Sequence, residues 1–66
     1  MKIQLNGSPH EIASMMSVTD LLASIGLAGK PVVVELDEQA LFPRDYSQVT
    51  VVDGSRVEVI MLAAGG

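Results

Sequence analysis

The terminal dipeptide Gly65-Gly66 is the part of this 66-residue sequence whose residue types most suggest chemistry. It follows Ala63-Ala64, so the last four residues carry no side chain larger than a methyl group. A segment with so little bulk can pass through a narrow channel and adopt the φ and ψ that a partner imposes. Fully extended, it reaches ~13 Å at about 3.3 Å per residue, enough to insert the Gly66 carboxylate into another protein's active site.

The numbers of histidine and cysteine residues argue against catalysis by side chains. A hydrolase needs a nucleophile, a base and an orienting acid in one pocket, and His10 is the only histidine. It follows Pro9 at an expected turn, where a solvated histidine is the ordinary expectation. The adjacent acids Asp37-Glu38 also indicate an exposed turn, because catalytic carboxylates face each other across a cleft. Without cysteine, zinc sites built from Cys and His are excluded, so we expect no metal and no cofactor bound by this chain.

Charge and hydropathy restrict the partners and the compartment. Eight acidic against four basic residues give a net charge of -4, which favours a basic protein partner over nucleic acid. The longest apolar run, residues 59–64, is far below the ~20 residues of a membrane-spanning helix. The first residues alternate apolar with polar and lack the apolar centre of an export signal. We expect a single cytoplasmic domain over residues 1–66 that binds no membrane, with a flexible tail at residues 63–66.

Periodicity predicts the elements that position this tail. Residues 1–6 alternate as a strand, and Asn6-Gly7 with Ser8-Pro9 predicts a tight reversal after which residues 10–13 return. A helix of about two turns is expected next, capped by Ser17 and stopped by Gly26. Its apolar face has the spacing i, i+3, i+4 and i+7, in Val18, Leu21, Leu22 and Ile25.

Further extended segments are expected at residues 32–36, 40–42, 49–52 and 56–62. The first is largely apolar, which suggests burial on both faces, and a turn at residues 37–39 follows it. Pro43 ends the segment at residues 40–42 and indicates that this segment lies at the edge of the sheet. Together these elements predict an α+β fold, a mixed sheet of four to five strands with one main helix packed on one face.

The last predicted strand carries two apolar residues on its otherwise charged face. Val57, Val59 and Met61 share one face, and Ile60 and Leu62 share the other with Arg56 and Glu58. Since this second face leads directly into the tail, we expect Ile60 and Leu62 to form part of an exposed docking surface for a partner.

The sequence resembles the sulfur carrier proteins of the ubiquitin-like β-grasp fold, most closely the ThiS family of thiamine thiazole synthesis. The resemblance spans the chain, and Asp37-Glu38 stands where family members commonly have Asn-Gly. The segments that carry it are Val32-Val33-Val34-Glu35-Leu36, Phe42-Pro43-Arg44, Asp53-Gly54, Val57-Glu58-Val59 and Ala64-Gly65-Gly66.

This resemblance implies a protein co-substrate, not an enzyme. An E1-like adenylating enzyme of the ThiF type would activate Gly66 with ATP, and a sulfur donor such as a cysteine desulfurase relay would convert the product to a thiocarboxylate. Thiazole synthase of the ThiG type would then receive the sulfur. Gly65, Ala64 and Ala63 would thread into these partners, and the free chain is expected to be a monomer.

Three other interpretations remain open at the level of the sequence. The chain could serve as a small-subunit-like carrier of molybdopterin synthase, a related but usually longer group. It could be a non-catalytic ubiquitin-like binding module with an irrelevant tail, in which case a residue appended after Gly66 would change nothing. It could also be conjugated to a lysine through Gly66, which would leave a stable branched adduct.

Overall fold

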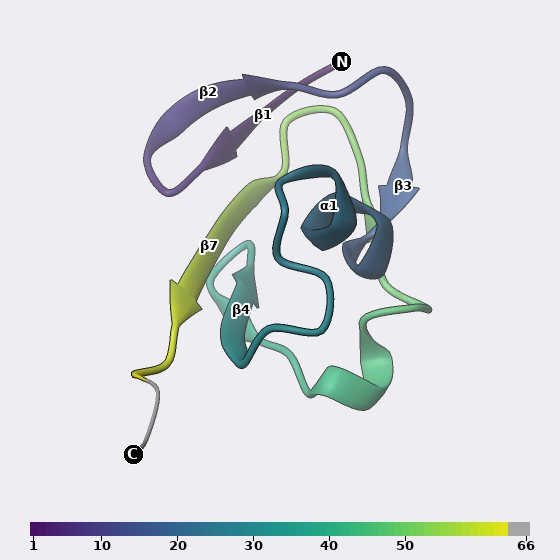
Figure 1. The fold of residues 1–66 in the computed structure, drawn as a ribbon. Coiled ribbons are helices and arrows are strands. Elements are labelled where there is room, and N and C mark those ends of the chain that lie inside the picture. The colour runs from purple at the N-terminus through teal and green to yellow at the C-terminus, as the bar shows by residue number, and fades with distance from the viewer. Residues whose placement is uncertain (64–66) are drawn as a thin grey trace.

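The computed structural model describes residues 1–63, in which one helix packs against one face of a sheet (Figure 1). The elements in chain order are β1 (Lys2–Leu5), β2 (Ser8–Glu11), β3 (Met16–Ser17), α1 (Val18–Ser24), β4 (Val32–Leu36), β5 (Gln39–Ala40), the 3₁₀ turn η1 (Pro43–Asp45), β6 (Thr50–Val51) and β7 (Arg56–Met61).

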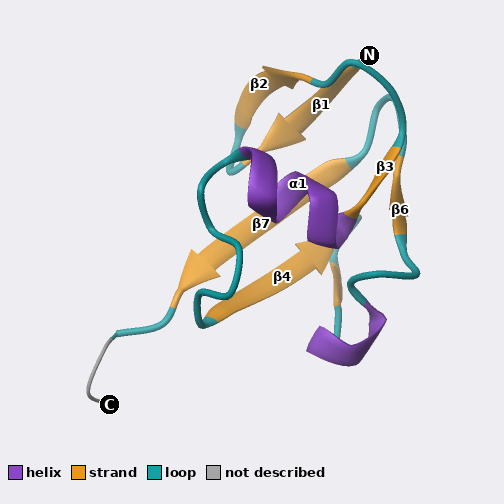
Figure 2. Cartoon of the chain, turned by 45° about the vertical axis from the view of Figure 1, so that its right-hand side comes forward, coloured by secondary structure: helices purple, strands orange, loops and turns teal. Residues whose placement is uncertain are grey.

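The main sheet has five strands in the order β2-β1-β7-β4-β5. β1 and β7 run parallel, and every other neighbouring pair in this sheet is antiparallel. β3 and β6 pair separately beside the helix (Figure 2). The predicted α+β class, a mixed sheet with one main helix on one face, is confirmed. The pairing order, which periodicity left undetermined, places β7 in the middle of the sheet.

Helix α1 forms where its sequence predicted it. The Ser17 hydroxyl accepts a hydrogen bond from the Asp20 N–H at 3.0 Å, and Gly26 follows the C-cap with a φ of 79°. The apolar face of the helix is buried against the sheet, as expected. The resulting core includes Ile3, Val18, Leu21, Leu22, Val34, Val57 and Val59, with Leu5 and Ile25 packed at its margin.

The first hairpin turns at Asn6-Gly7, whose φ values of 51° and 80° suit a two-residue reversal. The return strand begins at Ser8, so the expectation that Ser8-Pro9 belongs to the turn and that pairing starts at His10 was wrong. Pro9 is tolerated within β2 because it opposes Gln4 at a position whose N–H faces away from β1. The hydrogen bond from the Ile12 N–H to the Met1 carbonyl fixes this alternation.

The second hairpin turns at Asp37-Glu38, both with positive φ, and Gln39 already belongs to β5. The turn was expected to include Gln39 and the strand to cover residues 40–42, so both boundaries shift toward the N-terminus. β5 is an edge strand, as Pro43 indicated. The expected burial of β4 on both faces was wrong, because the helix covers only one face and Val33 is 38% exposed on the other.

Two short strands and the 3₁₀ turn had no clear signature in the sequence. β3 was not predicted, and β6 occupies only two residues of the extended piece expected at 49–52. Two residues are too few to show a period of two. β3 leads directly into α1, and β6 pairs with β3, so both strands lie beside the helix (Figure 2).

Candidate functional site

Strand β7 carries the chain toward its C-terminal residues. It is paired with β4 as far as Met61, which lies opposite Val32, and the Leu62 N–H then donates to the Pro31 carbonyl at 2.9 Å. Ala63 is exposed and is the last described residue. The predicted threading residues Ala64 and Gly65 and the predicted reacting residue Gly66 lie outside the described residues, so their roles stay predictions.

The expected apolar surface is present on the face of the sheet opposite the helix. Ile60 is 54% exposed and Leu62 49% exposed. Val33 lies directly across from Ile60 on β4. The Leu41 N–H donates to the Val34 carbonyl, so the β4–β5 register, continued past the end of β5, brings the exposed Phe42 opposite Val33. We call Phe42, Val33, Ile60 and Leu62 the outer patch.

Sequence reasoning identified Ile60 and Leu62 but missed Val33 and Phe42. Val33 lies within an apolar run that looks uniformly buried, and Phe42 is the last residue of the short segment expected at 40–42, just before Pro43. In the structure Phe42 is 61% exposed, with the Arg44 guanidinium carbon 4.7 Å from its ring centroid. The exposed aromatic beside a cation is the only local signal that could have indicated a surface role.

Acidic residues border the outer patch. Glu35 on β4 and Glu58 on β7 are direct cross-strand partners, next to the Val33 and Ile60 pair. Like charges placed opposite each other destabilise a sheet, and neither carboxylate forms an ion pair with another residue in the described part of the chain. Arg56, the nearest cation on β7, pairs instead with Glu38 at 3.7 Å. The edge of the patch is therefore suited to a basic partner surface.

Asn6 is a third residue that sequence reasoning did not place at this site. Its backbone N–H donates to the Val57 carbonyl, the last backbone contact from β1 to β7. Its side-chain carboxamide then accepts from the Val59 N–H at 2.7 Å and donates to the Val59 carbonyl at 3.2 Å. The carboxamide thus replaces one further peptide group of β1 and keeps β7 extended as it approaches the tail.

Other polar groups make no catalytic cluster in residues 1–63. His10 lies on edge strand β2, with Ile3 as its cross-strand partner. The Asp37 carboxylate accepts from the Arg56 N–H at 2.8 Å, so it stabilises the start of β7 rather than facing a second acid across a cleft. Within the same residues, no group of three or more His, Cys, Asp or Glu could hold a metal ion.

An open pocket of about 310 Å³ lies on the helical side of the molecule. Its walls come from α1, the loop after it and η1, and Lys30 is the only charged residue that lines it. It lies across the sheet from the outer patch. No described helix is long and apolar enough to cross a membrane.

The five-stranded mixed sheet, the single helix and the strand that leads into the C-terminal residues define a small ubiquitin-like β-grasp protein. A model of the ThiS family matches residues 3–66. The chain therefore belongs to the ThiS family.

Solved structures agree closely with this fold. The crystal structure of the thiamine biosynthesis protein ThiS from Geobacter metallireducens superposes with a TM-score of 0.87 and 33% identity, over 100% of both chains. A solution structure of a thiamine biosynthesis protein from the same organism has a TM-score of 0.83 and 33% identity, over 100% of this chain and 88% of the other.

Longer proteins contain a similar segment. Thiazole synthases from Paramagnetospirillum magneticum and Magnetococcus marinus are each 32% identical over 66 residues, covering 100% of this chain. The chain spans only 20% of the length of these curated relatives. A segment similar to this chain thus occurs within proteins named thiazole synthase in these two bacteria.

Proposed function

We propose that this protein is the sulfur carrier of thiamine thiazole synthesis and that Gly66 is its reacting residue. The observation that carries the proposal is the arrangement at the end of β7, where a β-grasp domain of the ThiS family presents an exposed apolar patch beside the segment leading to Gly65-Gly66. No residue pair in the described part of the chain is arranged for catalysis. The chemistry is therefore assigned to the terminal carboxylate and to partner enzymes.

The proposed cycle has two covalent steps at Gly66. A carboxylate is a poor electrophile, so an E1-like adenylating enzyme first joins it to the AMP portion of ATP and releases pyrophosphate. A sulfur donor such as a cysteine desulfurase relay then presents a persulfide, whose terminal sulfur attacks the acyl carbon and displaces AMP. A thiol reductant cleaves the S–S bond of the resulting acyl disulfide while being oxidised to a disulfide. The resulting thiocarboxylate is the form that delivers sulfur. The absence of cysteine from the chain means that no internal thiol competes for the activated acyl group.

The outer patch is the proposed docking surface for these enzymes. Ile60 and Leu62 lie at the base of the tail, so a partner that covers them is already placed to receive Ala63 and the residues beyond it. Glu35 and Glu58 at its border favour basic groups on the partner. Thiazole synthase is the proposed acceptor, because relatives with that name contain a similar segment within their own chains.

Intact-mass spectrometry tests the central step. The chain is incubated with the adenylating enzyme of its own organism, ATP and a sulfur donor, and is expected to gain the mass of one oxygen-to-sulfur exchange in its C-terminal peptide. Deletion of Gly66 should abolish the change, and omission of ATP serves as the control. If the chain stays unmodified while the same enzyme preparation thiolates another carrier, the proposed function is wrong.

A further inference from the structure

Along the edge of β7 that faces β1, the hydrogen-bond partner changes from one residue to the next. β7 continues past the end of β1 (Figure 2). The carbonyls of Ser55 and Val57 accept hydrogen bonds from the β1 side, and the Asn6 carboxamide covers both backbone groups of Val59. The next residue with the same orientation is Met61, because successive peptide groups alternate between the two edges of a strand.

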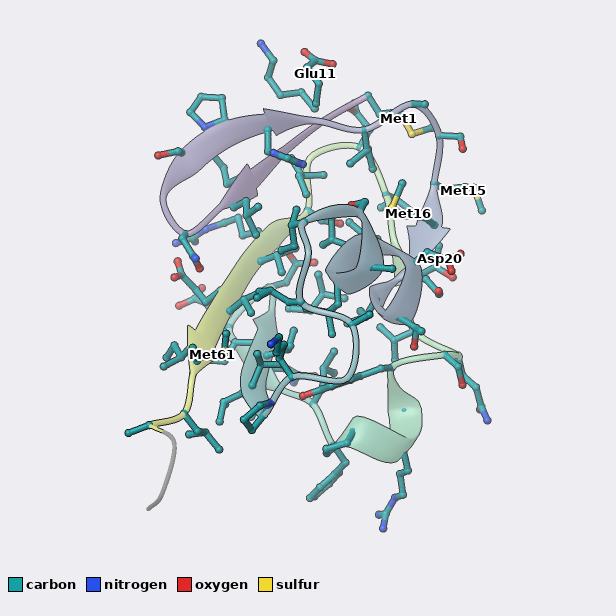
Figure 3. All side chains as sticks on the ribbon, in the orientation of Figure 1. Met1, Glu11, Met15, Met16, Asp20 and Met61 are labelled. Carbon is teal, nitrogen blue, oxygen red and sulfur yellow. The ribbon has the colours of Figure 1, made fainter. Side chains whose placement is uncertain are left out.

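The opposite edge confirms this alternation. The Leu62 N–H donates to the Pro31 carbonyl, and the Arg56 carbonyl accepts from the Asp37 N–H, so the even-numbered residues of β7 face β4. The Met61 N–H and carbonyl therefore point to the β1 side. No described residue occupies the position beyond Asn6 on that side, and Met61 is 49% exposed at the end of the strand (Figure 3).

We infer that the Met61 edge of β7 is a strand-addition site, at which an extended segment of the adenylating enzyme continues the sheet where β1 ends. Asn6 shows that this edge accepts a peptide-like group, since its carboxamide pairs with Val59 through both a donor and an acceptor. The same carboxamide terminates the internal sheet and leaves Met61 as the first open position.

The outer patch supports the same occupant. The row from Phe42 through Val33 to Ile60 ends beside Met61, so a partner that covers the patch brings its own backbone to the open edge. Main-chain pairing at Met61 would also hold the start of the tail in an extended form without recognising any side chain. This inference rests on the proposed function, because the adenylating enzyme is the first of the partners that the function requires.

The test compares Met61→Pro with Met61→Ala. Proline removes the N–H that faces the open edge and leaves the neighbouring bonds to β4 intact, whereas alanine removes the same side chain but keeps the N–H. Titration with the adenylating enzyme in the absence of ATP should show the proline variant binding about tenfold more weakly than the alanine variant, as expected for one buried hydrogen bond left unmade. Equal affinities would overturn the inference.

Amide hydrogen exchange of the wild-type chain gives a second readout that does not depend on how the variants fold. The Met61 N–H should exchange quickly in the free chain and slowly in the complex, with the Asn6-bound Val59 N–H slow in both. Slow exchange of Met61 in the free chain, from its own C-terminal residues at any concentration or from a second copy at high concentration, would assign another occupant and overturn the inference.

The two proposals can fail separately. A chain that acquires sulfur while Met61 remains unprotected in the complex contradicts strand addition and leaves the proposed function standing. A chain that binds with Met61 protected but never acquires sulfur supports strand addition and contradicts the function. Absence of any binding to the enzyme contradicts both.

Discussion

Glu38 occupies a backbone conformation that side chains with a Cβ rarely adopt. Its φ is 70°, and Asp37 before it has a φ of 49°, so the β4–β5 hairpin uses the kind of turn in which Asn-Gly is favoured. Asp37 compensates through its carboxylate, which accepts the Arg56 N–H. Glu38 has only an exposed ion pair with Arg56, an interaction of little net value in water.

Replacing Glu38 by glycine should therefore stabilise the protein. We expect Glu38→Gly to raise the free energy of unfolding by about 1 kcal/mol, because glycine adopts a positive φ without a steric penalty. Urea denaturation measures the change. Glu38→Ala is the matched control, since it also loses the ion pair but keeps a Cβ, and it should give no such gain. An equal gain in both variants would show that the charge, not the backbone, is responsible.

Gly65 should matter for chemistry and not for stability. A Cβ at this position is expected to obstruct passage of the tail through a partner's channel, so Gly65→Ala should lower kcat/KM for thiocarboxylate formation while the unfolding midpoint stays unchanged. Ala64→Gly is the control and should retain activity. The threading role of Gly65 would be contradicted by a Gly65→Ala chain that is activated as efficiently as the wild type.

Helix α1 provides one complete side of the core, although it is only seven residues long. Leu21 and Val18 are fully buried, and their partners come from strands at both ends of the sequence. In so small a protein this single apolar face supplies a large share of the burial. The helix thereby covers one face of the sheet, and the outer patch lies on the other.

Leu21→Ala should therefore be severely destabilising. Truncation of a large buried aliphatic side chain typically costs 2–5 kcal/mol, which approaches the total stability of a domain at the low end of the usual range. Chemical denaturation monitored by circular dichroism provides the measurement. Thr19→Ala, on the exposed side of the helix, is the control and should be nearly neutral. Equal effects would mean that the helix does not pack as described.

Substitutions at the end of β7 should, in contrast to Leu21→Ala, leave the stability of the fold intact and weaken partner binding. Ile60→Ser and Leu62→Ser remove exposed apolar surface, so the fold should persist while affinity for the adenylating enzyme falls. Calorimetric titration measures the affinity, and Val52→Ser, an exposed apolar residue outside the outer patch, is the control. Global unfolding of the Ile60 or Leu62 variants would show that these side chains serve the core instead.

The sequence predicted the helix and most strands because their residues repeat over several turns or pairs. It predicted the bounds of β4 but not its burial, because a run of valines indicates apolarity and not which face another element covers. It also failed at Asn6, whose carboxamide binds a residue 53 positions later in the chain. The Asn-Gly pair indicated the turn correctly, but no local pattern reveals that the asparagine side chain extends the sheet.

At the scale of the whole molecule, both outer edges of the main sheet discourage self-association. β2 contains Pro9 at a position whose N–H would otherwise face outward, and β5 has only two residues. The net charge of -4 adds repulsion between copies. These features are consistent with the expectation that the free chain is a monomer.

Sedimentation equilibrium should show that monomer over a wide range of concentration. Pro9→Thr restores an outward-facing N–H and a residue suited to strands, so it should increase association at high concentration without loss of the fold. Gln39→Thr on the other edge strand is the control, and it should have less effect because β5 is so short. A wild-type dimer at micromolar concentration would contradict this view of the edges.

The outer patch lies next to the base of the tail, and this position affects how partner enzymes share the carrier. If Gly66 reacts and Ile60 and Leu62 dock the partners as proposed, the activating and receiving enzymes cover the same side chains, so they exclude each other and the carrier binds them in turn. The lifetime of each carrier–enzyme complex must be short compared with the interval at which sulfur is needed. This requirement sets a lower limit on the dissociation rate and thus an upper limit on useful affinity. A small surface with a few exposed apolar side chains suits such short residence times better than a large interface would.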